Sequence, residues 1–541
     1  MDRRKRFYLF LPFFIAFALF IGGISYADVD IPDAKKPVSK SAAVAPAAAA
    51  PAVVASGPSL SDVLRRIDAL ESRSAGGNVN APKIRGLNLG FEIRHRFELR
   101  TDPNGFEDRG TASGKDPSTD SDFTLQRTRI WLDADVNKNV RGYVKLQDVR
   151  TWGAEQSTAG NLSRVDLLEG YVELRNLGDL SSLLENVSVK IGRWQQWYGN
   201  HRLIGHLNWA NEARSYDGIK VRWDNKKSAW VDFFAYQIQE DQTGGVSGET
   251  GDGNTVGAVG SPGQKDELFW GVYSSVKVAD GVAIEPYLII RNRSRDADGS
   301  RTGGAAVGEQ RYTAGARIHG KKMPWLPGVD FTFEQVWQFG KQESNPSGST
   351  AYSSQDIQAF AGAWGVGYTF SNVAWTPRIG VDYVFASGDD NGAPDGRNNT
   401  FSQLYPTGHA RLGYMDFHGW QNIEDWQIHF SAKPTKKLLL KADFHMFEAA
   451  EEGDAWYTVG GGGGRSAAPK FGGPATSFDD EYGDEIDITV KYQFLKNFGV
   501  VAGYSHYFID DAIENFVDRE TGGPGNDGDT DWFYVQTTMK F

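Results

Sequence analysis

The chain beyond residue 85 alternates between apolar and polar positions. Apolar residues occupy every second position in segments of roughly ten residues, and clusters of turn-forming residues separate the segments. A period of two is typical of β-strands that have one apolar and one polar face. Eighteen such segments follow one another, approximately at residues 85–101, 122–137, 139–151, 164–176, 186–195, 214–224, 227–240, 265–279, 281–294, 308–320, 327–342, 354–371, 373–387, 422–433, 436–449, 482–495, 498–511 and 528–541. The pattern predicts an all-β fold with about eighteen strands.

The connections between these segments alternate in length. Those after even-numbered segments are mostly short, for example residues 224–226 and 433–436, whereas those after odd-numbered segments are longer, for example residues 241–264 and 388–421. The short connections are rich in Lys and the long ones in Asp and Glu. An up-and-down antiparallel barrel produces this alternation when its two ends face different compartments. We name these ends the short-turn end and the long-loop end.

The last segment has the form of a barrel-closing strand. Residues 532–541 end on Phe541 and place Phe533, Val535 and Met539 on the same face. After the first 24 residues no run of 18 apolar residues occurs, which excludes a helical membrane protein. In hydrocarbon every backbone amide needs a partner, and a closed barrel is the β structure that supplies one. We therefore expect an 18-stranded transmembrane β-barrel in the outer membrane of a Gram-negative bacterium, with a secreted β-sandwich or propeller as the alternative.

The first 85 residues differ in composition from the rest. A basic stretch, an apolar stretch and then Ser25-Tyr26-Ala27 predict a secretory signal peptide. The next thirty or so residues are rich in Ala, Pro and Val and predict a tether. Apolar positions then recur at spacings of three and four, which predicts a short amphipathic helix or coiled coil. The expected domains are a signal peptide at residues 1–27, a tether at 28–58, the short helix at 59–75 and the barrel at 85–541.

The composition narrows the classes of function. The chain contains 57 Lys and Arg against 69 Asp and Glu, a net charge of −12, which argues against a nucleic-acid partner. It contains no Cys, so disulfides, thiolate metal sites and Cys nucleophiles are excluded. His201, His206 and His409 are not accompanied by a nucleophile motif, so we expect neither enzymatic activity nor a cofactor. The acidic loops at 388–392 and 525–531 lack the spacing of a calcium loop, so we expect no metal site.

The polar face of the strands should line the interior of the barrel. In the first segment this face carries Arg94 and Arg96, and in the second it carries Arg127 and Arg129. The same rule places further residues inward, namely the cations Lys145, Arg317 and Arg378 and the acidic neighbours Asp382, Glu485 and Asp487. Two interpretations stay open. Cross-strand ion pairs brace the inside of many barrels, whereas fixed guanidinium groups in a narrow channel favour anions and bind carboxylates.

Several stretches of the chain carry a resemblance to a known family. They are residues 147–153 (QDVRTWG), 191–205 (IGRWQQWYGNHRLIG), 209–217 (WANEARSYD), 401–409 (FSQLYPTGH) and 483–487 (GDEID). With these stretches the chain resembles the alginate-export family of outer-membrane barrels over about residues 85–541. The resemblance implies a monomeric barrel of eighteen strands, with an Arg-rich constriction that passes an anionic polyuronate from the periplasm to the exterior.

The resemblance also implies particular site residues. Its candidate constriction residues are Arg150, Arg193 and Arg202, with Asp148 and Asp217 as the expected ion-pair partners. Arg193 has the same parity as Ile191, which should face lipid. A place for Arg193 in the lumen therefore requires a β-bulge or a chain that has already left the membrane.

Together these observations predict an outer-membrane channel that passes an anionic polysaccharide (a polyuronate) or another anionic solute passively through an Arg-lined lumen. The alternatives are a general diffusion porin for small solutes and a plugged adhesive or structural barrel. The expected partners are outer-membrane lipid, lipopolysaccharide and the anionic solute, with no nucleic acid. Residues 59–75 are a candidate contact for a periplasmic secretion partner or for self-association.

Overall fold

The computed structural model describes the barrel part of the chain. The described residues are 86–101, 121–154, 165–239, 267–293, 308–344, 353–389, 396–452, 454–460, 480–513 and 529–541. The predicted signal peptide, tether and short helix, at residues 1–27, 28–58 and 59–75, lie outside the described residues. No helix in the described part has the length and apolar character that a membrane span needs.

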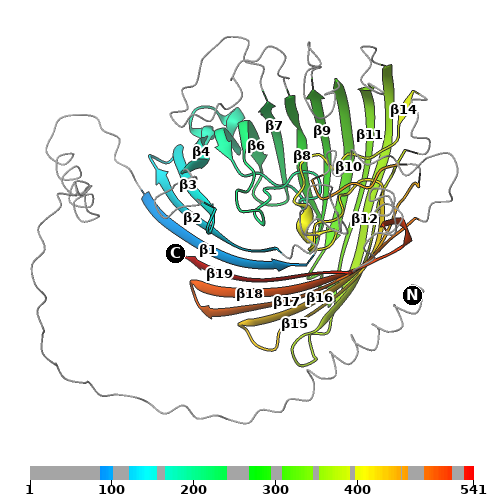
Figure 1. The fold of residues 1–541 in the computed structure, drawn as a ribbon. Helices are drawn as coiled ribbons and strands as arrows, with labels where there is room; N and C mark the ends of the chain where they lie inside the picture. Colours follow the sequence, from blue (N-terminus) through cyan, green and yellow to red (C-terminus); the bar gives the residue numbers. More distant parts are fainter. Residues whose placement is uncertain are drawn as a thin grey trace, which may run out of the picture. The chain divides into compact units, whose positions relative to one another are not determined.

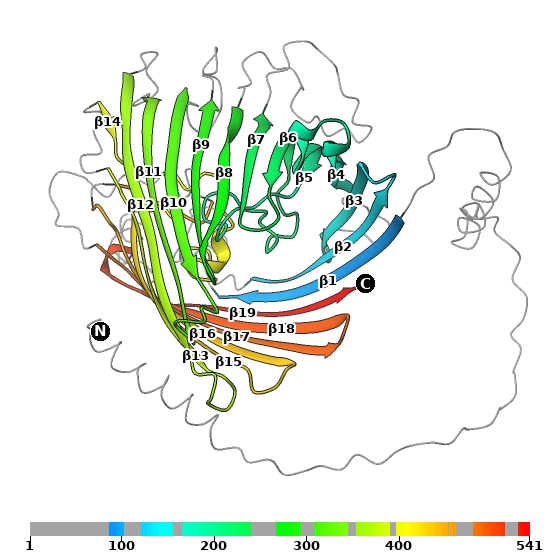
Figure 2. The ribbon, with the colours of Figure 1, turned by 180° about the vertical axis from the view of Figure 1, so that it is seen from behind.

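The described strands form one closed antiparallel barrel (Figures 1 and 2). Eighteen long strands follow one another round the ring, and the ring closes because β1 pairs with both β2 and β19. These strands are β1 (Gly86–Arg100), β2 (Ser121–Asp135), β3 (Val140–Thr151), β4 (Asp166–Leu174), β5 (Val187–Trp194), β6 (Tyr216–Asp224), β7 (Ala229–Gln239), β8 (Glu267–Ala279), β9 (Val282–Arg293), β10 (Glu309–Gly320), β11 (Val329–Ser344), β12 (Ser353–Thr369), β13 (Arg378–Ala386), β15 (Ile423–Ala432), β16 (Leu438–Glu448), β17 (Glu481–Leu495), β18 (Phe498–Ile509) and β19 (Thr530–Lys540). A further two-residue strand, β14 (Arg397–Asn398), pairs in parallel with β12. The predicted eighteen-stranded barrel is confirmed.

The predicted segments match their strands to within two residues at all but one boundary. The exception is the segment predicted at 373–387, because its strand β13 begins only at Arg378. The residues before it form a turn in which Trp375 and Thr376 have φ angles of 68° and 44°. A strand requires negative φ, so the apolar alternation of this turn does not belong to the strand.

The outward face of the strands is a band of large apolar side chains. Leu89 on β1, Ile130 on β2 and Phe233 on β7 keep 69%, 48% and 54% of their surface exposed. Exposed residues of the same kind elsewhere in the ring include Phe333, Ile379 and Trp426. A water-soluble protein rarely exposes apolar surface on this scale, whereas a transmembrane barrel places such a band against lipid. The alternation along the chain thus separates a lipid face from a polar interior.

Two connections of the long-loop end fold back into the interior (Figures 1 and 2). We name residues 195–215, between β5 and β6, the first inner loop, and residues 399–422, between β14 and β15, the second inner loop. The loops join in a short parallel bridge between Ile204 and Tyr405. There the Tyr405 N–H donates to Leu203 O at 2.9 Å, and the Gly205 N–H donates to Tyr405 O at 2.8 Å. The sequence predicted only long connections here, so their infolding emerges from the tertiary structure.

Apolar packing helps to hold the inner loops inside the barrel. The first inner loop contributes Tyr198 and Ile204, and the second contributes Phe401 and Trp420, to a buried cluster that also includes inward aromatic residues of the strands. A side chain of this size contributes roughly 1.5–3 kcal/mol when it leaves water. This gain helps to offset the entropy that is lost when the loops become ordered.

Candidate functional site

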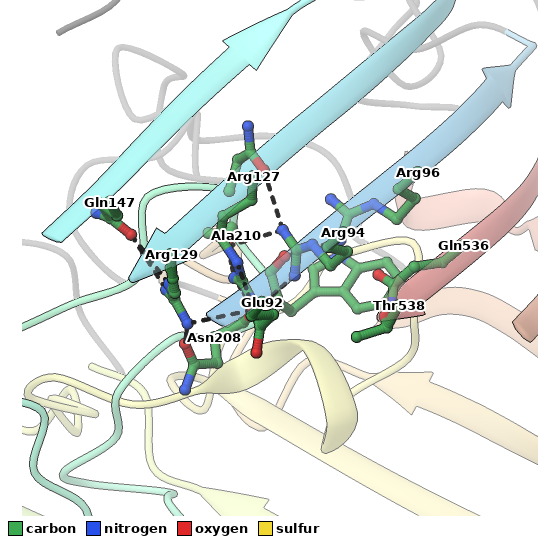
Figure 3. A network of polar contacts seen from close by, with 12 residues as sticks. Glu92, Arg94, Arg96, Arg127, Arg129, Gln147, Asn208, Ala210, Gln536 and Thr538 are labelled. Carbon is green, nitrogen blue, oxygen red and sulfur yellow. Dashed lines mark hydrogen bonds and ion pairs between the residues drawn. The ribbon is translucent and has the colours of Figure 1, made fainter. Parts of the chain in front are cut away.

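Four inward arginines lie together against the first inner loop. We name them the arginine cluster: Arg94 and Arg96 on β1, and Arg127 and Arg129 on β2. All four side chains are buried. Figure 3 shows Arg94, Arg127 and Arg129 pointing toward the loop at Asn208. Their inward orientation agrees with the period-two prediction.

Backbone carbonyls of the first inner loop accept many of the cluster's hydrogen bonds. Arg94 Nη1 donates to Asn208 O at 2.9 Å, and Arg127 Nη1 donates to the same oxygen at 3.0 Å. Arg96 Nη1 donates to Trp209 O at 2.8 Å, and its Cζ lies 3.9 Å from the centroid of the Trp209 ring. Hydrogen bonds from charged donors contribute about 1.5–3 kcal/mol each. The arginine cluster therefore fixes the first inner loop against the wall.

Carboxylates balance only part of the cluster's charge. Glu92 lies 2.8 Å from Arg127 and 3.9 Å from Arg129. Glu98 lies 2.6 Å from Arg96. Among the described residues Arg94 has no ion-pair partner and donates instead to loop oxygens. The cluster thus carries excess positive charge, but most of its donors are already directed at the loop.

The three other predicted lumen cations lie inward, and each is ion-paired. The pairs are Lys145 with Glu169, Arg317 with Glu285 (2.8 Å) and Arg378 with Asp330 (2.6 Å). Side-chain ion pairs of this kind connect neighbouring strands and brace the wall. For these residues the geometry favours the bracing interpretation.

The predicted acidic residues Asp382, Glu485 and Asp487 contact histidines and the backbone of the second inner loop. Glu485 accepts the backbone N–H of Met415 at 2.9 Å, and Asp487 accepts that of Tyr414 at 3.2 Å. Asp382 lies 3.8 Å from His429. Asp487 lies 3.9 Å from His445, so Asp382 and Asp487 lie within ion-pair distance of histidines, whereas Glu485 forms no ion pair among the described residues. Glu485 and Asp487 instead hold the second inner loop.

Two predicted constriction residues lie on the outward face. Arg193 shares its face with Ile191, which is 52% exposed, and pairs with Asp217 at 2.5 Å. The pairing of β5 with β6 is continuous through this position, so the bulge that an inward Arg193 requires is absent there. The placement of Arg193 in the lumen was therefore wrong, whereas its predicted ion pair with Asp217 is present.

Arg150 and Asp148 follow the same rule. They pair with each other at 2.7 Å and share a face of β3 with the exposed Leu146. The intervening residue Gln147 is the one that points inward, where it donates to Glu212 O at 2.7 Å. Both ion pairs implied by the resemblance exist, but neither lines the lumen.

The third predicted constriction residue, Arg202, lies at the junction of the two inner loops. Its side chain is 5% exposed, and its Nε and Nη1 have no hydrogen-bond partner in the described part of the chain. Burial lowers the pKa of Arg202. The ring of Trp420 lies 5.4 Å from its Cζ. Arg202 is therefore a buried cation with unsatisfied donors.

A second arginine without an ion-pair partner, Arg411, comes from the second inner loop. No carboxylate of the described residues lies within ion-pair distance of its guanidinium group. Burial and the neighbouring positive charge of Arg202 lower the pKa of Arg411 to about 10, so it stays charged at neutral pH. Sequence analysis missed Arg411 because it lies in a long connection, where the period of two assigns no residue to the inward face. Its position two residues after the family-like stretch 401–409 was the only available signal.

Arg411 faces a polar cavity of about 480 Å³ on the short-turn side of the inner loops. The inner loops line it with Asn200, Arg411 and Tyr414, and the wall contributes Arg317, Arg378 and Lys441 together with Asp330, Asp382 and Asp443. The paired wall residues neutralise one another, which leaves Arg411 as an unpaired cation in the lining. The cavity can therefore accept a carboxylate or another small anion.

Two histidines of the first inner loop add no charge near neutral pH. Burial is the main cause that lowers the pKa of His201 to about 4 and that of His206 to about 4. Trp197 packs against both rings, with centroid distances of 5.8 and 5.0 Å. Near neutral pH the positive charge of the inner loops thus comes from their arginines.

Comparisons with known proteins give one family and a set of similar solved barrels. Residues 85–523 match the family model described as alginate export. Among solved structures, the chain is similar to OccAB4 of Acinetobacter baumannii (9% identity, TM-score 0.49, covering 85% of this chain and 100% of that one). It is also similar to the outer membrane protein OprD of Pseudomonas aeruginosa (11% identity, TM-score 0.48, covering 86% and 97%). No curated protein matches.

Proposed function

The chain belongs to the alginate export family, and from this premise we propose that it passes an acidic polysaccharide, a polyuronate, through its lumen. Family membership and the closed barrel make the protein an outer-membrane channel. Passage is passive and follows the concentration of the polymer or the action of a periplasmic secretion partner. The substrate and the role of individual arginines are the proposed part.

One observation carries the choice of an anionic substrate. Arg411 and Arg202 come from different inner loops, the charge of Arg202 acts on Arg411, and neither has an ion-pair partner among the described residues. A guanidinium group offers a planar pair of donors that fits a carboxylate. A carboxylate that enters the cavity would pair with Arg411 and offset the repulsion that Arg411 feels from Arg202.

The expected size of this effect suits a polymer. At an effective dielectric constant of about 20, one ion pair at about 4 Å contributes roughly 4 kcal/mol. This corresponds to a dissociation constant of about 1 mM. A chain that presents several carboxylates gains affinity at each further cation, because later contacts are intramolecular. Short uronates should therefore bind weakly, and longer ones progressively better.

The pairing of Lys145, Arg317 and Arg378 favours one alternative function, a general diffusion porin for small solutes. In such a porin the wall charges brace the barrel and exert little selectivity. The two proposals differ in what they predict for charged and neutral solutes of equal size.

Single-channel recording of the purified protein in a planar bilayer tests the proposal. We expect an anion-selective reversal potential in a salt gradient, and block by oligouronates but not by neutral oligosaccharides of the same length. Arg411→Gln should weaken this block about tenfold, equivalent to about 1.4 kcal/mol. Conductance without selectivity or block would leave a general porin, and a silent bilayer would indicate a plugged barrel.

Arg193→Gln is the matched control for Arg411→Gln. It also removes one guanidinium group, but on the outward face, where Arg193 pairs with Asp217. Its block by oligouronate should equal that of the parent protein. An equal loss of block in both variants would show that net charge, and not the cavity, governs the interaction.

A further inference from the structure

A second cavity, of about 560 Å³, lies at the short-turn end beneath β16 to β19. Its lining contains six lysines, namely Lys433, Lys436, Lys437, Lys491, Lys496 and Lys540, and no Asp or Glu. We name these residues the lysine patch. The remaining lining is uncharged. A concave surface with one sign of charge raises the local concentration of counter-ions.

Two members of the lysine patch point into the barrel and not toward lipid. Lys540 pairs in register with Glu92, which lies on the inward face of β1. Lys491 has the parity of Thr489, which is buried in the interior. The other four lysines come from the turns between β15 and β16 and between β17 and β18. Because Lys491 and Lys540 line the interior, lipid headgroups alone do not explain the patch.

Several cations elsewhere at the short-turn end are paired, whereas Lys226, Lys227, Lys321 and Lys322 form no ion pair among the described residues. Lys138 lies 3.0 Å from Asp179, Lys277 lies 2.6 Å from Asp280, and Arg141 forms ion pairs with carboxylates of neighbouring strands. In the lysine patch no ion pair occurs among the described residues. Lys437 Nζ donates to a backbone carbonyl, that of Phe494, at 3.2 Å. The lysine patch therefore gathers six cations around one cavity without a carboxylate, whereas carboxylates balance the charge around Lys138, Lys277 and Arg141.

The lysine patch adjoins the cavity that contains Arg411. On the inward face Lys491 of β17 lies opposite Leu439, and Lys441 lies opposite Thr489, so Lys491 and Lys441 are diagonal neighbours. Lys441 also lines the Arg411 cavity. Cationic side chains thus follow one another from the short-turn mouth to the Arg411 cavity, with Lys441 paired to Asp443 between Lys491 and Arg411.

We propose that the lysine patch is the capture site at which an acidic polysaccharide first binds from the short-turn side, before it reaches Arg411. The proposal rests on the proposed function and adds the side and the place of capture. Lysine suits this role because its ammonium group is strongly hydrated and carried on a flexible stem. It attracts a polyanion without holding it in one fixed geometry, so the captured chain can move on.

The test compares two triple variants that lose the same charge. Lys433→Gln, Lys436→Gln and Lys496→Gln remove the exposed turn lysines of the patch. The control variant carries Lys138→Gln, Lys226→Gln and Lys277→Gln, three short-turn-end lysines outside the patch. Both also carry Leu183→Cys, at a 90% exposed position between β4 and β5. Because the chain has no other Cys, an impermeant thiol reagent reports which end faces each chamber.

Block by a defined oligouronate is then recorded with the oligomer on either side. In the patch variant we expect the rate of block from the short-turn side to fall about tenfold at low salt. The reason is that electrostatic attraction of a charged ligand to a site raises its association rate at least tenfold. The difference should vanish near 1 M salt, where the screening length is about 3 Å. The residence time and the rate from the long-loop side should stay unchanged. The control variant should change less than twofold.

The outcomes separate the capture site from the proposed function. A parent protein that conducts but is never blocked contradicts both. If the parent protein is blocked and the patch variant is blocked at the same rate, the capture site alone is overturned. Equal slowing in the two variants, or slowing from both sides, overturns it as well, because net charge would then be the cause. Loss of bound anionic lipid without loss of capture would assign the lysines to headgroups and overturn the proposal.

Discussion

The arginine cluster on β1 and β2 and the lysine patch at the short-turn end of β16 to β19 are both cationic, but they differ in what they contact. The arginines are buried, and many of their donors reach the first inner loop. The lysines are exposed and have no ion pair among the described residues. An inward cation is therefore available to a solute only where the fold leaves it without an internal acceptor.

The largest expected effect comes from breaking the arginine cluster. Arg127→Ala removes the ion pair with Glu92 and the hydrogen bond to Asn208 O. Removal of one member of a buried pair typically costs about 3–5 kcal/mol. We expect a lower midpoint of thermal unfolding by circular dichroism and a larger, noisier single-channel conductance, because the first inner loop is released. An unchanged conductance would mean that the loop is held by its other contacts.

A lower pH should affect the first inner loop, which the arginine cluster holds, but not the lysine patch. The pKa values of His201 and His206 are lowered from 6.5 to about 4 when the first inner loop is in place. If the loop leaves the wall, the two histidines regain an ordinary pKa and bind protons at a higher pH. The loop arrangement is therefore fully stable above pH 6.5 and loses stability as the pH falls toward 4, by up to about 3 kcal/mol per histidine. The lining of the lysine patch contains no histidine and no carboxylate, so the patch should not respond.

Conductance recorded from pH 7.5 to pH 4.5 measures this response. We expect the conductance noise to rise below pH 6, when the first inner loop begins to move. The double variant with His201→Gln and His206→Gln should lack this pH-dependent component. The rate of oligouronate block from the short-turn side should remain constant, provided that the oligomer itself stays ionised. A pH response that survives in the double variant would assign it to other groups.

The smallest effect should come from the outward pairs. Arg193→Ala removes an ion pair whose side chains are 38% and 54% exposed, and exposed pairs contribute about 0–1 kcal/mol. We expect little change in the unfolding midpoint and no change in conductance or oligouronate block. A changed block in this variant would return Arg193 to the lumen and would remove the distinction between outward and inward arginines.

The sequence analysis was wrong where the alternation along a strand and the family resemblance placed a residue on different faces. Parity placed Arg193 beside Ile191 on the lipid face, and the structure keeps it there. The resemblance alone moved Arg150 and Arg193 into the lumen. Alternation along a strand is a local property of the extended backbone, so it holds at every position of a regularly paired strand. A shared motif fixes a residue's neighbours along the chain but not the compartment that its side chain faces.

The sequence by itself determined the number of strands, their lipid and lumen faces, and the two chemically different ends. These features follow from the period of two and from the need of every amide in hydrocarbon for a partner. Only the tertiary structure decided that residues 195–215 and 399–422 fold inside, and that Arg202 and Arg411 meet there. Those contacts join positions about two hundred residues apart, such as Ile204 and Tyr405. No local pattern encodes them, because they depend on how side chains from distant strands pack within one closed ring.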